Sequence, residues 1–406
     1  MQEAPGDNPA PPALVFPVDR LLCAALCVLL LVACGRPPEQ RALTPDPSTA
    51  PAQAEPPPRN IILMIGDGMG FAHIAAARIH AHGADGRLAL DQLPVVGHIT
   101  THSADALVTD SAAAGTALAT GLKTDNRRIA MTRDNKALYT ILEAARDHGL
   151  ATGLVVTSAI THATPAVFAA HVPHRRQEAD IARQMLEGSV DVMLGGGRRF
   201  FLPPSAGGER TDGRNLIEEA RRRGYTVVSD SEALARASAR RVLGLFAHAA
   251  MTTHAPEPTL AQMTTRALEL LSAHRKGFFV MIEGSQIDWA GHDNDAEKLL
   301  RQMLVFDEAV RAALDFARRE GRTLVVVTAD HETGGMAILD GALDGGRLEL
   351  GWNTKRHTAG DAAVYAFGPR AFDFTGVYDN TRIPKLFAGY LGVEDFPRAM
   401  ALPVPP

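Results

Sequence analysis

Acidic and imidazole side chains follow three apolar runs of this sequence. The runs NIILMIG, FFVMI and TLVVVT have the length and composition of buried strands. Taken singly, an Asp or His at such a place could simply cap a helix or form a hydrogen bond. Their joint placement after three strands favours a metal site, since carboxylate oxygen and imidazole nitrogen are common metal ligands. These candidate ligands are Asp67, Glu283, Asp288, His292, Asp330 and His331.

The spacing of these residues indicates how they could converge. Asp288 and His292 are four residues apart, so one turn of helix would place both on the same face. Asp330 and His331 are adjacent and must diverge, but a loop could still bring both to one ion. A mixture of oxygen and nitrogen ligands suits zinc, and catalytic zinc keeps one position open for water or substrate.

A nucleophile is available in the segment TDSAAAGTA, where a helix of small residues is predicted to begin at Ser111. The segment lacks the G-x-S-x-G pattern of a nucleophile elbow. A serine at a helix N-terminus lies in the positive end of the helix dipole, and a nearby metal ion would lower its hydroxyl pKa. The alternative is a plain N-cap formed by Asp110 or Ser111.

Strands and helices alternate through most of the chain and must position these residues. Alternation of this kind predicts an α/β fold, a three-layer sandwich with a mostly parallel central sheet. Ligands bind beyond the carboxyl ends of such strands. The predicted strands are Ile61–Ile65, Ala151–Thr157, Val190–Leu194, Tyr225–Val228, Val242–Phe246, Phe278–Ile282, Thr323–Thr328 and Ala362–Phe367. The predicted helices are Lys136–His148, Glu178–Leu186, Arg214–Arg223, Thr259–His274 and Ala296–Glu320.

The composition is that of a globular protein with a large core. Of the 406 residues, 46% are hydrophobic and 21% are charged, which excludes a disordered chain or a multi-span membrane protein. The 41 basic and 46 acidic side chains give 41 − 46 = −5, too near balance to favour a nucleic-acid partner. We see no internal repeat, so one catalytic domain is the simplest interpretation.

The N-terminal segment is predicted to direct export. Cys23 and Cys27 lie in an apolar run from Leu21 to Ala33, which is too short to span a bilayer and is typical of a signal peptide. Its end, LVACG, resembles a bacterial lipobox in which Cys34 would be acylated. The acidic residues before the run do not fit a signal peptide, and a secreted protein without lipid is the alternative. We expect a signal peptide over 1–33, a Pro/Ala-rich tether over 34–59 and a catalytic domain over 60–406.

Five motifs together resemble the alkaline phosphatases over the region from about Asn60 to near the C-terminus. They occur in the family's order, and a sixth segment, KRHTAGD, adds His357. The motifs are IGDGMG at Asp67, TDSAAAGTA at Ser111, THATPA at His162 and Thr164, EGSQIDWAGH from Glu283 to His292, and TADHETGG at Asp330 and His331.

The resemblance implies a reaction and a set of metal ligands. Ser111 would form a covalent phosphoserine during hydrolysis of phosphate monoesters, with two zinc ions and a third ion, in the family usually magnesium. One zinc would be held by Asp288, His292 and His357, and the second by Asp67, Asp330 and His331. The third ion would lie between Asp67, Thr164 and Glu283, with Asp110 as a further candidate ligand.

Three other positions are assigned by the same resemblance. Arg175 falls where the family places an arginine on the phosphate oxygens, which suits bidentate pairing. His162 and Trp289 stand where some bacterial members carry Asp and Lys, so we expect them to lie just behind the ligands. A histidine beside the third site could favour a softer metal there.

Related enzymes of the same superfamily supply the alternatives, a phosphodiesterase or a sulfatase. Sulfatases mature a C/S-x-P-x-R motif, and the residues from Ser111 to Gly115 contain neither Pro nor Arg. Diesterases are expected to lack the third site, for which Thr164 and Glu283 are present. We therefore expect small phosphate monoesters as substrates, no nucleic-acid partner, a location in the cell envelope with membrane contact only through a lipid on Cys34, and leave a homodimer open.

Overall fold

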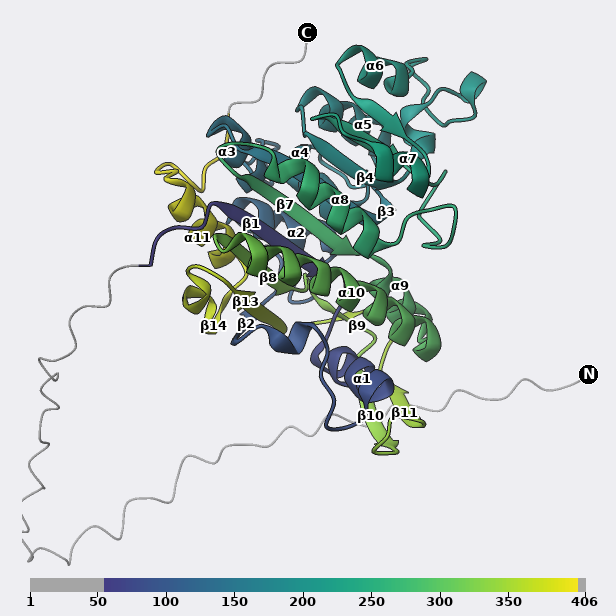
Figure 1. Ribbon diagram of the computed structural model, residues 1–406, viewed down its shortest axis with the longest axis vertical. Helices are drawn as coiled ribbons and strands as arrows, with labels where there is room; N and C mark the ends of the chain where they lie inside the picture. Colours follow the sequence, from purple (N-terminus) through teal and green to yellow (C-terminus); the bar gives the residue numbers. More distant parts are fainter. Residues whose placement is uncertain (1–54, 401–406) are drawn as a thin grey trace, which may run out of the picture. The chain divides into compact units, whose positions relative to one another are not determined.

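A ten-stranded sheet is the central layer of residues 55–400, the part of the chain that the computed structural model describes (Figure 1). The predicted signal peptide, Cys34 and most of the predicted tether lie outside these residues. The strand order is β14-β2-β13-β8-β1-β7-β3-β4-β6-β5. The bounds are β1 Asn60–Gly66, β2 Val95–Thr100, β3 Ala151–Ala159, β4 Val192–Gly196, β5 Thr226–Val228, β6 Val242–Leu245, β7 Phe278–Gly284, β8 Thr323–Thr328, β13 Ala362–Phe367 and β14 Gly376–Asp379.

Every neighbouring pair in this sheet is parallel except the two pairs that involve β13. The central strands β1, β7 and β8 are buried along their whole length. Continuous apolar runs are expected for parallel strands covered on both faces. Burial of each large aliphatic side chain contributes roughly 1.5–3 kcal/mol. The predicted α/β fold with a mostly parallel central sheet is confirmed.

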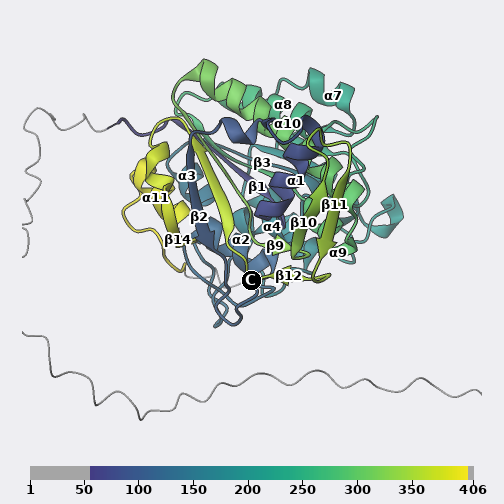
Figure 2. The same cartoon turned by 90° about the horizontal axis from the view of Figure 1, so that it is seen from below.

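Helices cover both faces of the sheet, as the view in Figure 2 shows. Helices α8 and α10 pack together over β1, β3, β7 and β8, while α3 and α4 cover the opposite face with α2 beside them. The α-helices are α1 Phe71–His82, α2 Ser111–Thr120, α3 Ile141–Asp147, α4 Ala163–Ala169, α5 Glu178–Glu187, α6 Leu216–Arg222, α7 Ser231–Arg236, α8 Leu260–Ser272, α9 Gln286–Asp293, α10 Ala296–Glu320 and α11 Arg382–Leu391. Within residues 55–400, no helix combines the length and apolar character that crossing a membrane requires.

Two small two-stranded sheets and four short 3₁₀ helices complete the described fold. The segment from Glu332 to Thr358 carries a hairpin, β10 with β11, and a two-residue ladder, β9 with β12. Their bounds are β9 Glu332–Thr333, β10 Met336–Gly341, β11 Leu348–Trp352 and β12 His357–Thr358. The 3₁₀ helices are η1 Leu90–Gln92, η2 Arg198–Phe201, η3 Pro204–Ala206 and η4 Ala371–Phe374.

One predicted helix begins later than its sequence pattern indicated. The prediction placed its start at Lys136, whereas α3 begins at Ile141. Thr140 caps the helix, because its side chain accepts from the N–H of Glu143 and the Glu143 carboxylate accepts from the N–H of Thr140. This capping box fixes the start of the helix. The preceding residues form isolated bridges with other segments instead.

Candidate active site

Strand β1 lies between the two other strands that end in candidate ligands. Ile65 of β1 pairs with Glu283 of β7 on one side and with Thr328 of β8 on the other. Because the three strands are parallel, their carboxyl ends meet at one edge of the sheet. Helix α9, which follows β7, adds Asp288 and His292 at the same edge.

Asp67, Asp330 and His331 form the first group of potential ligands. One ligand atom of each lies within 4.8 Å of the others. His331 Nε2 is 3.2 Å from Asp330 Oδ2 and 3.5 Å from Asp67 Oδ1. All three side chains are fully buried. The backbone N–H of Gly68 donates to Asp330 Oδ1 at 3.1 Å, which orients this carboxylate.

The electrostatics of this group favour a cation. Burial, together with neighbouring carboxylates, raises the pKa of Asp67 well above its ordinary value. Burial also raises the pKa of Asp330 to about 6 and lowers the pKa of His331 well below its ordinary value. Two carboxylates and a neutral imidazole thus share a site that water does not reach. A divalent ion bound there would offset the cost of burying the negative charge.

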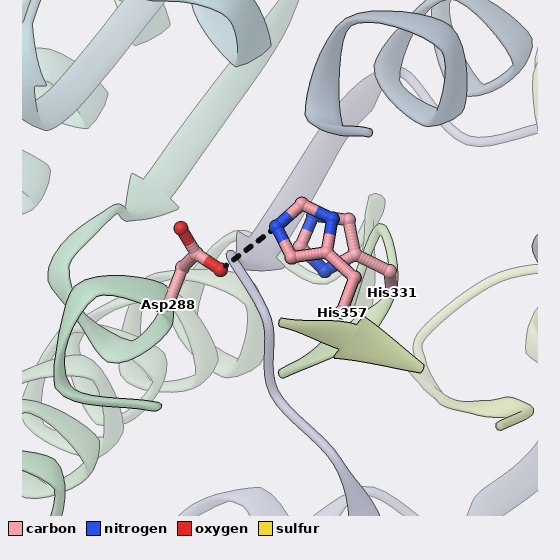
Figure 3. Close-up of side chains that lie close together, drawn as sticks. All are labelled: Asp288, His331 and His357. Carbon is pink, nitrogen blue, oxygen red and sulfur yellow. Dashed lines mark ion pairs between the residues drawn. The ribbon is translucent and has the colours of Figure 1, made fainter. Parts of the chain in front are cut away.

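Asp288, His331 and His357 form the second group (Figure 3). Asp288 approaches from α9, and its Oδ1 lies 3.4 Å from His357 Nε2. The rings of His331 and His357 stack with centroids 3.6 Å apart. His357 Nδ1 lies 2.8 Å from the carbonyl oxygen of Thr109, which leaves Nε2 to face Asp288. A fixed ring nitrogen of this kind is typical of metal-binding histidines.

His292 lies beside this second group. Its Nε2 is 3.4 Å from Asp288 Oδ1 and 3.1 Å from His357 Nε2. The hydrogen bond to Asp288 raises the pKa of His292 to about 9. Burial alone would raise the pKa of Asp288, but hydrogen bonds from His292 and His357 hold it well below its ordinary value. The side chains predicted for the first zinc are therefore brought together.

Asp67, His162 and Glu283 form the third group. Burial raises the pKa of Glu283 to about 7. Burial lowers the pKa of His162 to about 3, so its imidazole is neutral and able to bind a metal ion. The sequence predicts that His162 lies behind the ligands, and one of its ring nitrogens lies within 4.8 Å of carboxylate oxygens of Asp67 and Glu283, so its role toward the ion stays a prediction. Thr164 is fully buried in the first turn of α4, two residues beyond His162.

Unpaired polar atoms gather at these groups. Thirteen buried side-chain atoms lack a hydrogen-bond partner among residues 55–400, and six of the thirteen belong to a residue in one of the groups or to Thr164. Buried polar atoms are nearly always satisfied, so their concentration here indicates metal ligands. The residues present fit two mixed oxygen and nitrogen sites and a third site rich in oxygen. The six atoms are Asp67 Oδ1 and Oδ2, Asp330 Oδ2, Glu283 Oε1, Thr164 Oγ1 and His162 Nδ1.

Ser111 lies at the first position of α2, next to the ligand groups. Its Oγ is 3.3 Å from His331 Nε2, and the residue is 2% exposed. Asp110 caps the helix by accepting from the N–H of Ala113 at 3.0 Å. The hydroxyl therefore lies at the positive end of a ten-residue helix and beside the groups that contain His331.

Arg175 is held next to Ser111 by an ion pair with Asp110. Its Nη1 lies 3.1 Å from Asp110 Oδ2, and its Nη2 lies 3.3 Å from His162 Nε2. Both oxygens of Asp110 thus have protein partners, and Asp110 is absent from the ligand groups found in residues 55–400. Its assignment as a metal ligand stays a prediction. Trp289 makes an edge contact with His162, with ring centroids 6.0 Å apart, and so walls this side of the site.

Comparison with known proteins shows which family the chain belongs to. A sequence model of the family described as "Alkaline phosphatase" matches residues 58–345. The chain belongs to the alkaline phosphatase family. It is 37% identical to alkaline phosphatase 3 of Bacillus subtilis over 80% of this chain and 87% of that protein. It is 38% identical to streptomycin-6-phosphate phosphatase of Streptomyces griseus over 86% and 94%.

Solved alkaline phosphatases share the fold. The enzyme from the Antarctic bacterium TAB5 is 35% identical, with a TM-score of 0.76 over 83% of this chain and 99% of that chain. The Thermus thermophilus enzyme is 29% identical, with a TM-score of 0.78 over 85% and 94%. This alkaline phosphatase is therefore a metal-binding phosphatase, and hydrolysis of phosphate monoesters is the reaction that its family supports.

One residue of this alkaline phosphatase site was missed by the sequence reasoning. Thr333 Oγ1 donates to Asp288 Oδ1 at 2.5 Å and lies 3.3 Å from His331 Nδ1. It therefore connects a side chain of each predicted zinc site. A signal was present, since Thr333 lies within the TADHETGG motif two residues after His331.

Proposed function

We propose that this enzyme hydrolyses phosphate monoesters through a covalent phosphoserine on Ser111, using two zinc ions and one magnesium ion. The observation that carries the proposal is the position of Ser111 Oγ, 3.3 Å from His331 Nε2, beside two groups of buried ligands. Asp67, Asp330 and His331 would hold one zinc, and Asp288, His292 and His357 the other. When bound, such a pair of ions would neutralise the phosphate and activate oxygen nucleophiles.

The third ion would be held by Asp67, Glu283 and Thr164. Three oxygen donors suit the hard ion magnesium, although the imidazole of His162 in the same group would suit a softer metal. A form of the TAB5 enzyme in which one histidine is replaced by aspartate has been solved with Mg bound in the M3 site, so a relative can bind magnesium at such a site. Metal analysis of the purified protein tests the assignment, because the proposal requires about two zinc ions and one magnesium ion per chain.

In the first step, Ser111 Oγ forms a bond to phosphorus as the bond to the alcohol oxygen breaks. Solvent takes up the hydroxyl proton and returns one to the alcohol. In the second step, a water oxygen bonds to phosphorus as the bond to Ser111 Oγ breaks, the water gives up one proton to solvent, Ser111 Oγ takes one proton from solvent, and inorganic phosphate leaves. The guanidinium of Arg175 would bind phosphate oxygens in both steps, since bidentate pairing matches its geometry.

The decisive experiment compares one chromogenic monoester with the matching diester and sulfate ester. We expect turnover of the monoester at alkaline pH, much slower turnover of the others, loss of activity after chelation, and recovery on addition of zinc and magnesium. Ser111→Ala should bind inorganic phosphate but form no phosphoenzyme. Monoester turnover that survives chelation unchanged would overturn the metal mechanism, and faster diester or sulfate turnover would favour the related superfamily activities.

We also propose an exported enzyme that Cys34 anchors to the cell envelope. The support is the apolar run ending in LVACG, followed by a Pro/Ala-rich segment of suitable composition for a tether. Expression of the full chain and of Cys34→Ser in a bacterial host tests it. The native chain should fractionate with membranes and enter a detergent phase, whereas the variant should not. Equal behaviour of the two chains would contradict lipid attachment.

A further inference from the structure

Arg127 occupies an unusual backbone position next to the predicted phosphate contacts. Its φ is +75°, a left-handed backbone conformation that residues other than Gly and Asn seldom adopt. Its N–H donates to Asp110 Oδ1 at 3.0 Å, and its carbonyl accepts from the N–H of Arg175 at 2.8 Å. The strained residue is thus held between the two partners of the ion pair beside Ser111. Strain of this kind is concentrated at functional sites.

Lys355 and Arg356 come directly before the candidate ligand His357. The carbonyl oxygen of Lys355 is 2.7 Å from His292 Nδ1, and Arg356 directly precedes His357. The carbonyl oxygen of Arg356 accepts from the N–H of Gly334 at 2.9 Å, which fixes this segment to the turn that follows Thr333. The backbone of both residues is therefore tied to the site.

The side chains of Arg127, Lys355 and Arg356 share two properties. Each is exposed, and within residues 55–400 none makes a side-chain hydrogen bond or an ion pair. Among the arginines close in sequence, Arg175 pairs with Asp110 and Arg128 with Asp125, whereas Arg176 is exposed and makes no side-chain hydrogen bond or ion pair within residues 55–400. One exposed carboxylate without a partner, Asp361, follows in the same segment as Lys355 and Arg356. The two segments therefore carry three free positive charges against one negative charge, on a chain whose net charge is −5.

We propose that Arg127, Lys355 and Arg356 form a cationic rim that selects phosphate monoesters whose alcohol part carries a further negative group, such as a carboxylate or a second phosphate. The inference rests on the proposed function, because it assigns the part of the substrate that lies beyond the phosphate bound by Arg175. The rim would attract the anionic leaving group before the reaction and hold it during binding. A substrate with an uncharged alcohol part would gain only the attraction that its phosphate feels, which all monoesters share.

The experiment uses two three-carbon probes that differ in one carboxylate, 3-phosphoglycerate and glycerol 3-phosphate. The full-length, metal-loaded enzyme is assayed for release of inorganic phosphate at low ionic strength. We expect kcat/KM for 3-phosphoglycerate to exceed that for glycerol 3-phosphate by about fivefold, because each exposed charge pair contributes a factor of about two to five at most. The ratio should approach one at about 1 M salt, where the Debye length is about 3 Å.

Substitutions test whether the cationic rim causes the preference for 3-phosphoglycerate. In the triple variant R127Q/K355Q/R356Q, the ratio should fall toward one, because kcat/KM for 3-phosphoglycerate falls more than kcat/KM for glycerol 3-phosphate, whose phosphate alone is attracted by the rim. The matched control is Arg275→Gln, which removes an exposed positive charge just before β7, at the opposite end of the strands from the site. It should leave the ratio unchanged.

Each contrary result has a separate meaning. A native ratio of one or less, a ratio unchanged in the triple variant, or an equal fall in Arg275→Gln would overturn the rim. Failure of the metal-loaded native enzyme to release phosphate from either probe would instead contradict the proposed function on which the rim depends. Thermal unfolding of each variant shows that the folded state is retained in every comparison.

Discussion

Thr333 Oγ1 donates a hydrogen bond to Asp288 Oδ1 at 2.5 Å and lies 3.3 Å from Nδ1 of His331. Thr333 is fully buried and belongs to β9, which pairs with the β12 strand that begins at His357. One hydroxyl therefore fixes a carboxylate and an imidazole that approach from two different strand ends. Side chains that orient metal ligands affect affinity nearly as much as the ligands do.

Removal of this hydroxyl should weaken zinc binding. We expect Thr333→Val to reduce zinc affinity about 10- to 100-fold, the usual effect of losing such a partner. Competition with a chromogenic chelator measures the affinity directly and does not depend on turnover. Thr333→Ser keeps the hydroxyl and should retain most of the native affinity. Equal affinities for the Val and native proteins would show that Thr333 only fills space.

Substitution of Gly68 should disturb the site, and the same substitution at Gly213 serves as the control. Its φ is +72°, and an added Cβ would lie 2.8 Å from Asp288 Cα. Gly213 has the same φ, but a Cβ there would meet nothing within 4 Å. Both Ala variants should lose about 1 kcal/mol or more of unfolding free energy from backbone strain. Gly68→Ala should in addition displace α9 and lose most activity.

The comparison of the two glycine variants gives a clear outcome. Denaturant unfolding measures the stability of each, and monoester turnover at saturating zinc measures the site. If Gly68→Ala and Gly213→Ala lose stability and activity to the same extent, the close approach of β1 and α9 has no functional role. A larger activity loss in Gly68→Ala alone supports it.

The strands of the centre could be predicted from the sequence, and two strands near one edge could not. Eight of the ten strands of the main sheet coincide with apolar runs, because a strand buried on both faces must be apolar throughout. β2 alternates buried and more exposed residues and contains Gly97 and His98, so its apolar run is interrupted. β14 has only four residues, two of them exposed, and thus carries little signal.

Some features of the active site could likewise be predicted from the sequence, and others could not. Asp288 and His292 could be placed on one face because four residues make about one turn of helix. The ion pair between Asp110 and Arg175 joins residues 65 apart in the chain, and no local pattern indicates it. The same holds for Thr333, whose partner Asp288 is 45 residues away. Contacts of this kind depend on how the loops pack, which spacing does not encode.

Two buried carboxyl groups of the site, those of Glu283 and Asp330, should contribute less to the stability of the metal-free enzyme as pH rises. The pKa of Glu283 is raised to about 7 and that of Asp330 to about 6, in both cases first by burial. An acid whose folded pKa exceeds its unfolded value stabilises the fold below the unfolded pKa and loses that contribution as pH rises through the folded pKa. For these two residues the window extends from about pH 4 to about pH 7. The neutral, buried His162 and His331 act in the opposite direction, because their pKa values are lowered, so the carboxyl contribution is measured as a difference between variants. After chelation, the Tm of Glu283→Gln relative to that of the native protein should rise between pH 5 and pH 8.

Two comparisons check this prediction. Zinc and magnesium should remove the loss, since ions bind the deprotonated ligands and stabilise the fold more as pH rises. Glu283→Gln cannot ionise at this position, so the metal-free variant should not show the part of the pH dependence that Glu283 causes. A Tm difference between the two metal-free proteins that stays constant from pH 5 to pH 8 would contradict the burial of an unpaired carboxyl at Glu283.

The ion pair between Asp110 and Arg175 should control how tightly the enzyme holds phosphate. Asp110→Asn loses the negative charge that fixes the guanidinium, but its side-chain oxygen can still accept from the N–H of Ala113 and cap α2. A less fixed Arg175 should bind inorganic phosphate more weakly, so we expect the inhibition constant of phosphate to rise about three- to tenfold, the effect of losing roughly 1 kcal/mol of charge-assisted bonding. The Tm should change little.

Asp110→Ala is the control that also removes the cap of α2. It should raise the inhibition constant similarly and lower stability by about 1 kcal/mol. If phosphate inhibits the Asn variant as strongly as the native enzyme, Arg175 is positioned by other contacts.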